Sequence, residues 1–260
     1  MPKVRLDLCI VTRAMAENIS SAGRLVMAGQ VKVNGQVALS PSSLIDDQSE
    51  IQVDRGSVFV SRGGEKLLAA LQAFPIELEG RVCADVGAST GGFTDCLLQH
   101  GAARVYAIDV GYGLLHWKLR NDPRVVVMER TNARFVKSLP ETVSLVTMDA
   151  SFISIKTLLP VARGWFQLES GEVIALIKPQ FEANKQQAAL GEGVIHDSSV
   201  HREVLLNVLE AAERLGYALR GLIASPLRGP KGNVEFLAHL DISTPPVPGR
   251  VAESVSRLII

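Results

Sequence analysis

Apolar runs alternate with helical stretches along most of the chain after residue 81. Short apolar runs bounded by turn residues are typical of buried strands, and the segments between them carry apolar residues at helical spacing. This alternation predicts an α/β fold with a mostly parallel, seven-stranded sheet. The expected strands are 82–86, 104–108, 124–128, 143–149, 171–177, 217–224 and 234–241. The expected helices are 65–73, 92–100, 114–120, 132–136, 154–162 and 199–214.

The first 54 residues follow a different pattern and are expected to form a separate small α+β unit. Helical spacing of apolar residues begins at Leu6, and a second helix carries the apolar residues 25–27. Two short strands then flank Asn34-Gly35, the dipeptide type that most strongly favours a hairpin turn. Alternating polarity at 50–53 predicts a last short strand.

The chain is therefore expected to divide into two units and two connecting or terminal segments. The boundaries are 1–54 for the small unit, 55–62 for a linker, 63–243 for the α/β domain and 244–260 for a C-terminal tail. The polar, glycine-containing stretch 179–198 predicts a long loop, and such loops are usually functional or mobile. Prolines exclude regular structure at 244–250, and the tail after them is expected to be loose or to dock as a short helix.

Composition excludes few functions but does limit the cellular setting. The 27 Lys and Arg residues balance 27 Asp and Glu, so net charge gives no argument for nucleic acid, and a basic face must come from local asymmetry. Cys9, Cys83 and Cys96 are scattered, which indicates reduced thiols and no metal site. No apolar run approaches the roughly 20 residues of a membrane helix, and no signal-peptide core follows Met1. We expect a cytoplasmic protein without membrane contact, and the sequence gives no oligomeric state.

Candidate chemistry begins at the turn that follows the first strand of the α/β domain. Asp85 stands near the end of that strand, and Gly87, Gly91 and Gly92 follow before a helix. A glycine turn at a helix N-terminus places unpaired N–H groups beside a ligand. The next strand ends at Asp109, where nucleotide-binding folds carry an acid that accepts hydrogen bonds from ribose hydroxyls.

Three interpretations of this turn remain open: a nucleotide-type cofactor, a hydrolase nucleophile and an ordinary strand–helix turn. A dinucleotide fold favours Gly-x-Gly-x-x-Gly, but Ser89 replaces the middle glycine and Asp85 would repel a pyrophosphate. The carboxylate suits a ligand that carries an ammonium and a sulfonium, namely S-adenosylmethionine. Residues 87–91 also satisfy Gly-x-Ser-x-Gly, the nucleophile turn of α/β-hydrolases. An ordinary strand–helix turn is the third interpretation.

Four charged residues stand where strands are expected to end or helices to begin. Lys66 lies in the first turn of a helix, where a cation is unfavourable beside the positive end of the helix dipole. Asp149 and Lys178 end neighbouring strands and are expected to flank the ligand of the glycine loop. Glu235 is the fourth. Because an unpaired charge at a buried strand end is costly, we expect the two lysines and two carboxylates to meet.

Such a cluster suits methylation of a ribose 2′-hydroxyl. The reaction needs an oxygen nucleophile that is held in line with a sulfonium methyl group and relieved of its proton. Lys178 would contact the 2′-oxygen and stabilise the developing alkoxide, and Asp149 would orient Lys178. Lys66 and Glu235 would fix the hydroxyl. Much of the rate would come from positioning, because the sulfonium is already an activated methyl donor. No metal is required.

The order of elements in the small unit, with residues 5–7 and 22–35, resembles the S4 RNA-binding domain. The resemblance implies that two helices and the hairpin present basic side chains to structured RNA. The matching candidates are Arg5, Arg13, Arg24 and Lys32. The family usually carries a Ser-Arg pair near the start of the second helix. This chain has Asn18-Ile19 there, which removes one phosphate partner.

The four charged residues resemble the Lys-Asp-Lys-Glu tetrad of the FtsJ-like ribose 2′-O-methyltransferases. Together with the S4-like unit and the junction motif at 60–67, the chain from about residue 5 to 242 resembles the TlyA family. The resemblance implies a Rossmann-like methyltransferase fold and S-adenosylmethionine-dependent 2′-O-methylation of ribosomal RNA, usually at cytidine, with ribosomal RNA or a ribosomal subunit as partner. The cofactor contacts that it implies are Asp85, Gly87, Ser89, Gly91, Gly92, Phe93, Asp109, Asn132 and Asp149.

Two other functions remain alternatives. A hydrolase would use Ser89 with Asp149 and a later histidine, but it leaves both lysines without a role, and the turn follows the first strand of the domain, too early for that fold. The available histidines are His196, His201 and His239. A binding module would keep the RNA contact without catalysis. Members of the family have also been labelled haemolysins, yet no spanning segment and no strongly amphipathic basic helix supports a pore.

Overall fold

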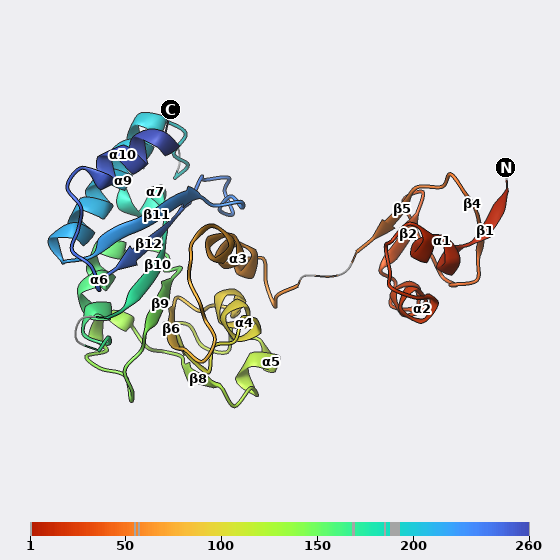
Figure 1. Ribbon diagram of the computed structural model, residues 1–260, viewed down its shortest axis with the longest axis horizontal. Helices are drawn as coiled ribbons and strands as arrows, with labels where there is room; N and C mark the ends of the chain where they lie inside the picture. The colour runs from red at the N-terminus through yellow and green to blue at the C-terminus, as the bar shows by residue number, and fades with distance from the viewer. Residues whose placement is uncertain are drawn as a thin grey trace. The chain divides into compact units, whose positions relative to one another are not determined.

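The sheet of the larger unit has the seven strands that the apolar runs predict (Figure 1). The structure is a computed structural model that describes residues 2–54, 56, 58–167, 170–184, 186–187 and 193–259. The chain forms two units, Met1–Val58 and Phe59–Ile260. The strands of the larger unit are β6 (Val82–Val86), β7 (Arg104–Ile108), β8 (Val125–Met128), β9 (Leu145–Met148), β10 (Glu172–Ile177), β11 (Ala218–Ala224) and β12 (Phe236–Asp241).

The sheet is mostly parallel, as expected. Its strand order is β11–β12–β10–β9–β6–β7–β8. The five strands from β10 to β8 in this order run parallel, whereas β12 is antiparallel to both β10 and β11. The central strands are covered on both faces, which explains why their sequences read as nearly continuous apolar runs.

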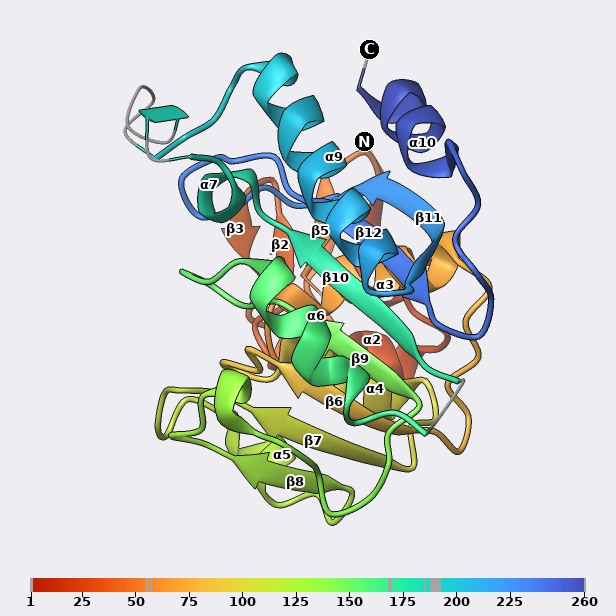
Figure 2. The same ribbon diagram turned by 90° about the vertical axis from the view of Figure 1, so that its left-hand side faces the viewer.

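Helices cover both faces of the sheet (Figure 2). One face packs against α3 (Gly63–Ala73), α4 (Gly92–Gln99) and α5 (Trp117–Arg120). The other face packs against α6 (Ile155–Arg163), α9 (Ser198–Arg214) and α10 (Arg250–Leu258). The result is a three-layer α/β domain with a separate core on each side of the sheet.

The strand order reverses beside β6, which has β7 on one side and β9 on the other. Because β6, β7, β9 and β10 are parallel, the loops after them leave the same edge of the sheet. Open α/β sheets bind ligands in the crevice at such a reversal. The antiparallel strand β12 starts at this edge, so Glu235, the residue before it, also lies there.

Two of the expected helices are shorter than the sequence pattern suggests. The helix expected at 114–120 is limited to α5, because His116 precedes it as an N-cap and its Nδ1 accepts the N–H of Lys118 at 3.2 Å. The helix expected at 132–136 is a 3₁₀ turn, η1 (Ala133–Phe135). Asn132 caps η1 by accepting the N–H of Arg134 at 3.1 Å. In both places a short-range cap replaces a full helical turn.

The long loop and the tail both contain a helix. The stretch 179–198 begins with the single turn α7 (Pro179–Glu182), and residues 185 and 188–192 lie outside the described part of the chain. The tail docks as α10, which buries Val251 and Val255 in the core beside α9. This helix is amphipathic and carries both acidic and basic residues, and its apolar side is covered by protein. Among the described residues, no helix is long and apolar enough to cross a membrane.

The small unit has an α+β fold with its own core. Its elements are β1 (Lys3–Arg5), α1 (Leu6–Thr12), α2 (Ile19–Met27), β2 (Val31–Val33), β3 (Gln36–Val37), β4 (Leu44–Asp46) and β5 (Ile51–Val53). The core residues include Leu6, Ile10 and Val26. Asn34 and Gly35 both have positive φ, 50° and 80°, as the expected two-residue hairpin turn requires.

Asn18 starts the second helix of this unit. Its side chain accepts the N–H of Ser21 at 2.9 Å, and the Ser21 hydroxyl accepts the N–H of Asn18 at 3.1 Å. This reciprocal pair is a capping box. The Asn18-Ile19 sequence that departs from the usual Ser-Arg pair therefore still supplies the helix start.

Candidate active site

The four charged residues predicted to meet form two ion pairs at the carboxyl edge of the sheet. Lys66 Nζ on α3 lies 2.5 Å from Glu235 Oε2, and Lys178 Nζ after β10 lies 2.6 Å from Asp149 Oδ1 after β9. The Glu235 side chain is 1% exposed and that of Lys178 is 8% exposed. Pairing offsets the cost of burying these charges, and neither lysine is left without a carboxylate.

Lys178 is held by more than its ion pair. Its ammonium donates to the hydroxyl of Ser151 at 3.1 Å and to the carbonyl oxygen of Asp149 at 3.4 Å. Oδ1 of Asp149 makes a close ionic contact with the ammonium but accepts no well-aligned hydrogen bond among the described residues. This oxygen is itself buried, so the Lys178 ammonium is the charge that offsets its burial.

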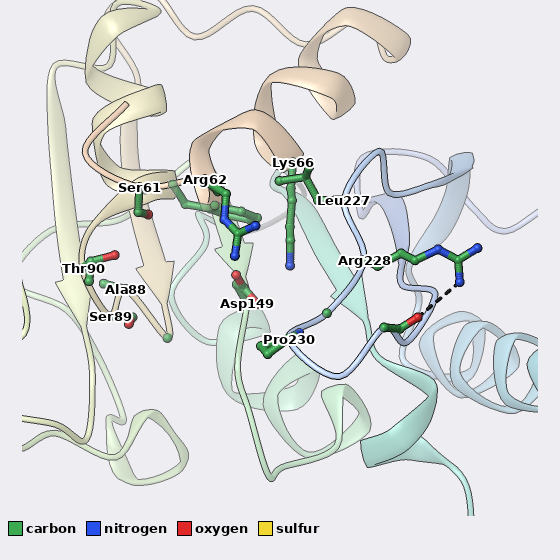
Figure 3. Close-up of a pocket in the computed structure, with 16 residues that line it drawn as sticks. Ser61, Arg62, Lys66, Ala88, Ser89, Thr90, Asp149, Leu227, Arg228 and Pro230 are labelled. Atoms are coloured by element: carbon green, nitrogen blue, oxygen red, sulfur yellow. Dashed lines mark hydrogen bonds between the residues drawn. The ribbon is translucent and has the colours of Figure 1, made fainter. Parts of the chain in front are cut away.

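A cavity of about 580 Å³ opens over this cluster. Lys66, Arg62 and Asp149 point into it from different elements (Figure 3). The glycine loop after β6 forms one side, and the loop 227–232 between β11 and β12 forms the other. Two cations and a carboxylate thus face a space large enough for a nucleoside.

A second cavity, of about 280 Å³, lies on the other side of Asp149. Its wall includes Ser89 of the glycine loop, Asp109 after β7, Asn132 before η1 and residues 149–153 after β9. The Asp109 carboxylate accepts the N–H groups of Ser89 at 2.8 Å and Gly111 at 2.7 Å. These bonds fix its oxygens in place while leaving lone pairs for further donors such as ribose hydroxyls. Asp149 belongs to the walls of both cavities.

The residues predicted to hold a cofactor are not all in equivalent places. Those on the wall of the smaller cavity are Gly87, Ser89, Asp109, Asn132 and Asp149. Gly92 and Phe93 line only the larger cavity. Gly91 lines neither cavity. Its φ of 96° makes it the left-handed residue before α4, so its contribution is to the shape of the loop.

Asp85 lies beneath the glycine loop and also lines neither cavity. Cys83 and Asp85 face the same side of β6, because alternate residues of a strand point to the same side, and α4 covers that side. The carboxylate accepts the hydroxyls of Thr94 at 2.7 Å and Thr147 at 3.0 Å. Burial raises the pKa of Asp85 to about 7. Asp85 therefore supports the loop from below, where the sequence suggested a contact with the ligand's cationic groups.

The raised pKa predicts a pH dependence of stability. Between roughly pH 4, the pKa of an unfolded aspartate, and about pH 7, the folded protein keeps a proton that the unfolded chain has lost. The free energy of unfolding should therefore fall as pH rises through this window. Asp85→Asn should remove this component. The difference in the free energy of unfolding, variant minus parent, should rise by roughly 4 kcal/mol from pH 4 to pH 8. Urea unfolding at each pH measures this difference.

Asp122→Asn is the control for this measurement. The hydrogen bond from Arg124 lowers the pKa of Asp122, so above about pH 5 its carboxylate is ionised in both states and contributes no slope. Stability curves of the parent and Asp85→Asn that stay parallel from pH 4 to pH 8 would show that Asp85 titrates normally.

The hydrolase interpretation finds no geometric support. Asp149 is paired with Lys178. His201 shares a hydrogen bond with the carbonyl oxygen of Ile195 at 3.0 Å, and His239 pairs with Glu172 at the start of β10, the opposite end of the strand from the glycine loop. His196 is exposed. None of the three histidines lines either cavity in the described part of the chain.

The basic candidates of the small unit differ in their freedom to bind RNA. Arg13 donates to the carbonyl oxygens of Ser49, at 2.8 Å, and Asp47, so it holds a loop of its own unit. Arg5 pairs with Asp7 at 2.7 Å but its side chain is 51% exposed. Lys32 is exposed on β2. Arg24 is also exposed to solvent, and its guanidinium donates to the Ser20 hydroxyl at 3.0 Å.

The sequence analysis gave no role to several polar residues near the site, among them Ser151, Arg62 and Asn233. Ser151 accepts a hydrogen bond from Lys178, and Arg62 lines the larger cavity. Buried Asn233 accepts the N–H of Ile195 and donates to the carbonyl oxygen of Gly193, both at 2.9 Å, and so ties the end of the long loop to the segment before Glu235. Arg62 belongs to the junction motif, which was a usable signal. Ser151 and Asn233 carry no charge, and nothing in the sequence pattern indicated a role for them.

Comparison with known proteins agrees with this geometry. The family model described as FtsJ-like methyltransferase matches residues 59–242, and the S4 domain model matches residues 4–51. The 16S/23S rRNA (cytidine-2′-O)-methyltransferase TlyA of Mycobacterium tuberculosis is 45% identical to the chain, over 93% of the chain and 91% of that protein. Hemolysin A of Brachyspira hyodysenteriae is 41% identical, over 92% of the chain and 100% of that protein.

Solved structures show the same relationship. A structure from Streptococcus thermophilus, described as a hemolysin, has a TM-score of 0.73 and 41% identity, and covers 99% of this chain and 96% of its own. An S-adenosylmethionine dependent methyltransferase from Mesorhizobium loti, at 12% identity and a TM-score of 0.50, shares the fold over 70% of this chain and 99% of its own. The chain therefore belongs to the TlyA family, in which an S4 domain is joined to an FtsJ-like methyltransferase domain.

Proposed function

We propose that the chain transfers a methyl group from S-adenosylmethionine to a ribose 2′-hydroxyl of ribosomal RNA, with a cytidine as the target. The observation that carries the proposal is the position of the Lys178–Asp149 pair. Asp149 belongs to the walls of both cavities, so a group that binds in one lies next to a group that binds in the other. Methyl transfer requires this proximity of donor and acceptor.

The smaller cavity fits the cofactor. Asp109 accepts ribose hydroxyls, and Asn132 and residues 150–153 surround the base. When bound, S-adenosylmethionine supplies an activated methyl group. The larger cavity takes the target nucleotide, whose phosphates Arg62 attracts.

Each member of the charged cluster has a separate task in this proposal. Lys178 donates to the 2′-oxygen and stabilises the negative charge that develops as the hydroxyl loses its proton. Asp149 and Ser151 hold the Lys178 ammonium in place. Glu235 fixes Lys66, whose ammonium lines the larger cavity and orients the hydroxyl. The two ion pairs hold both ammonium groups in place, which lowers the reorganisation needed during the reaction.

The proposal is tested by incubating the purified chain with ribosomal subunits and S-adenosylmethionine labelled in its methyl group. Alkali cleaves RNA through attack of the 2′-oxygen on the neighbouring phosphate, so a 2′-O-methylated nucleotide resists hydrolysis. We expect the label in an alkali-resistant dinucleotide that begins with cytidine. Label recovered on a base, or no label with either subunit, would contradict the proposal. Calorimetric titration of S-adenosylmethionine into the chain tests the cofactor separately.

The S4-like unit predicts different outcomes for two of its cations. Lys32→Glu should weaken RNA binding roughly tenfold at low salt, because it removes a phosphate contact and adds repulsion. Its melting temperature should stay unchanged, since Lys32 is exposed. Arg13→Ala should instead lower the melting temperature by several degrees, because two loop carbonyls lose their donor. Filter binding measures the RNA affinity of each variant, and thermal unfolding measures its melting temperature. A stable Arg13→Ala that loses RNA affinity, with a Lys32→Glu that keeps it, would refute these roles.

A further inference from the structure

The positions of Lys178 and Asp149 relative to one another are not fixed by the sheet. Among the described residues, the β9–β10 register ends at the pair Met148–Ala175. Beyond it, the N–H of Asp149 donates to the carbonyl oxygen of Val86 on β6, at 2.9 Å. On the other side, β10 continues to pair with β12 as far as Ile177. Asp149 is therefore held by β6 and Lys178 follows a strand end that is held by β12, so no β9–β10 pairing fixes the two residues relative to each other.

Glu182 spans this gap a few residues further along both segments. Its Oε1 accepts the N–H of Ile155 at 2.6 Å, and its Oε2 accepts the hydroxyl of Ser154 at 2.6 Å. Glu182 ends α7, which starts directly after Lys178, and Ser154 is the N-cap of α6, which follows the segment carrying Asp149. A carboxylate at a helix N-terminus is favourable, because it binds free N–H groups and complements the dipole.

Two further contacts lie between this bridge and the ion pair. The ring of Phe152, which is 90% exposed, touches the ring of Phe181 with centroids 4.9 Å apart, and Lys178 donates to Ser151. The segments after β9 and β10 are therefore joined at successive positions, and the Glu182 bridge closes the series at its far end. Phe152 has a φ of 64°, unfavourable for a residue with a side chain, so the turn that it occupies needs such support.

We propose that Glu182 is a positioning residue for methyl transfer: by capping α6 it locks the segment after Lys178 onto the segment after Asp149 and fixes the geometry of the ion pair. This inference rests on the proposed function. Glu182 lines neither of the two ligand cavities, so it acts through Asp149 and Lys178. Displacement of a catalytic group by about 1 Å can lower a rate by roughly 100-fold.

The test compares two substitutions of similar length. Glu182→Met fills the same space but accepts no hydrogen bond, and it should lower kcat about tenfold or more at saturating S-adenosylmethionine and RNA. Glu182→Gln keeps an acceptor for Ile155 and should retain kcat within about threefold. Amide exchange of the Ile155 N–H should accelerate in Glu182→Met but not in Glu182→Gln, which reports on the bridge without reference to activity.

Glu141→Met is the matched control. Oε1 of Glu141 also accepts two hydrogen bonds, from Arg104 at 2.7 Å and Tyr106 at 2.9 Å, but at the amino end of β7, away from the site. Its loss should lower the melting temperature and leave kcat within about twofold, as expected for a purely structural carboxylate. If Glu182→Met does not fold, Glu182→Asp, which is one methylene too short for the bridge, takes its place with the same expected drop in kcat.

The proposal is overturned if kcat of Glu182→Met stays within about twofold of the parent, or if Glu182→Gln loses as much activity as Glu182→Met, since charge rather than the bridge would then matter. Absence of methyl transfer by the unmodified chain would contradict the proposed function, and the exchange rate of the Ile155 amide would still decide whether the bridge holds the two segments together.

Discussion

Lys178→Ala should lower the rate of methyl transfer roughly 1000-fold, the effect of removing a donor that stabilises a developing oxyanion. The side chain is 8% exposed and is the only partner within ion-pair distance of Asp149 among the described residues. No other described lysine lies within ion-pair distance of that carboxylate, so no neighbouring group replaces the lost ammonium. The substitution also leaves Asp149 as an unpaired, largely buried carboxylate.

RNA binding separates the catalytic role of Lys178 from a role in RNA recognition. Lys178 is buried, and the 2′-oxygen at the reaction centre is the one RNA contact proposed for it, so the affinity for RNA should stay within about twofold in filter binding. Methyl transfer that survives in Lys178→Ala while RNA binding is unchanged would show that the catalytic assignment is wrong. Loss of both would indicate that the lysine acts in binding.

Gly87→Ala should destabilise the methyltransferase domain by roughly 3 kcal/mol or more and abolish cofactor binding. Gly87 has a φ of 83°, and an added Cβ would lie 2.7 Å from the carbonyl oxygen of Asp149 and 3.0 Å from Cα of Ala150. Both atoms belong to the backbone, so neither can move aside as a flexible side chain would. The turn after β6 and the segment after β9 would have to separate, and both cavities lie along that contact.

Gly80→Ala provides a matched control within the same domain. Gly80 has a similar φ of 72°, but an added Cβ would meet nothing within 4 Å. It should cost only about 1 kcal/mol, the penalty of a left-handed residue with a side chain, and leave cofactor affinity unchanged. Urea unfolding and calorimetric titration measure the two quantities. Equal effects of the two substitutions would show that the close approach at Gly87 is not tight.

The strands of the large domain were predictable because each is a short buried run between turn residues. The strands β1 and β4 of the small unit were not predicted, since three-residue strands of mixed polarity carry too little periodicity to be recognised. The shortened helix before residue 120 depends on the His116 cap, a local hydrogen bond that apolar spacing does not report.

The sequence indicated which charged residues would meet and that Asp149 would contact Lys178, but not the fold that brings Lys66 to Glu235. Lys66 and Glu235 are 169 residues apart, and only the position of β12 beside β10 brings them together. Asp85 was misplaced for a related reason. Its position near a strand end suggested a ligand contact. Its side chain instead points to the face of β6 that α4 covers, and a position near a strand end does not indicate which face a side chain takes.

The shared wall between the two cavities has a thermodynamic consequence. A ligand in either cavity acts on the same carboxylate of Asp149. Any change that the first ligand makes in that carboxylate alters the binding free energy of the second, and reciprocity requires an equal effect in the other order. If donor and acceptor occupy these two cavities as proposed, their affinities are coupled, and each affinity has to be measured at a stated occupancy of the other cavity.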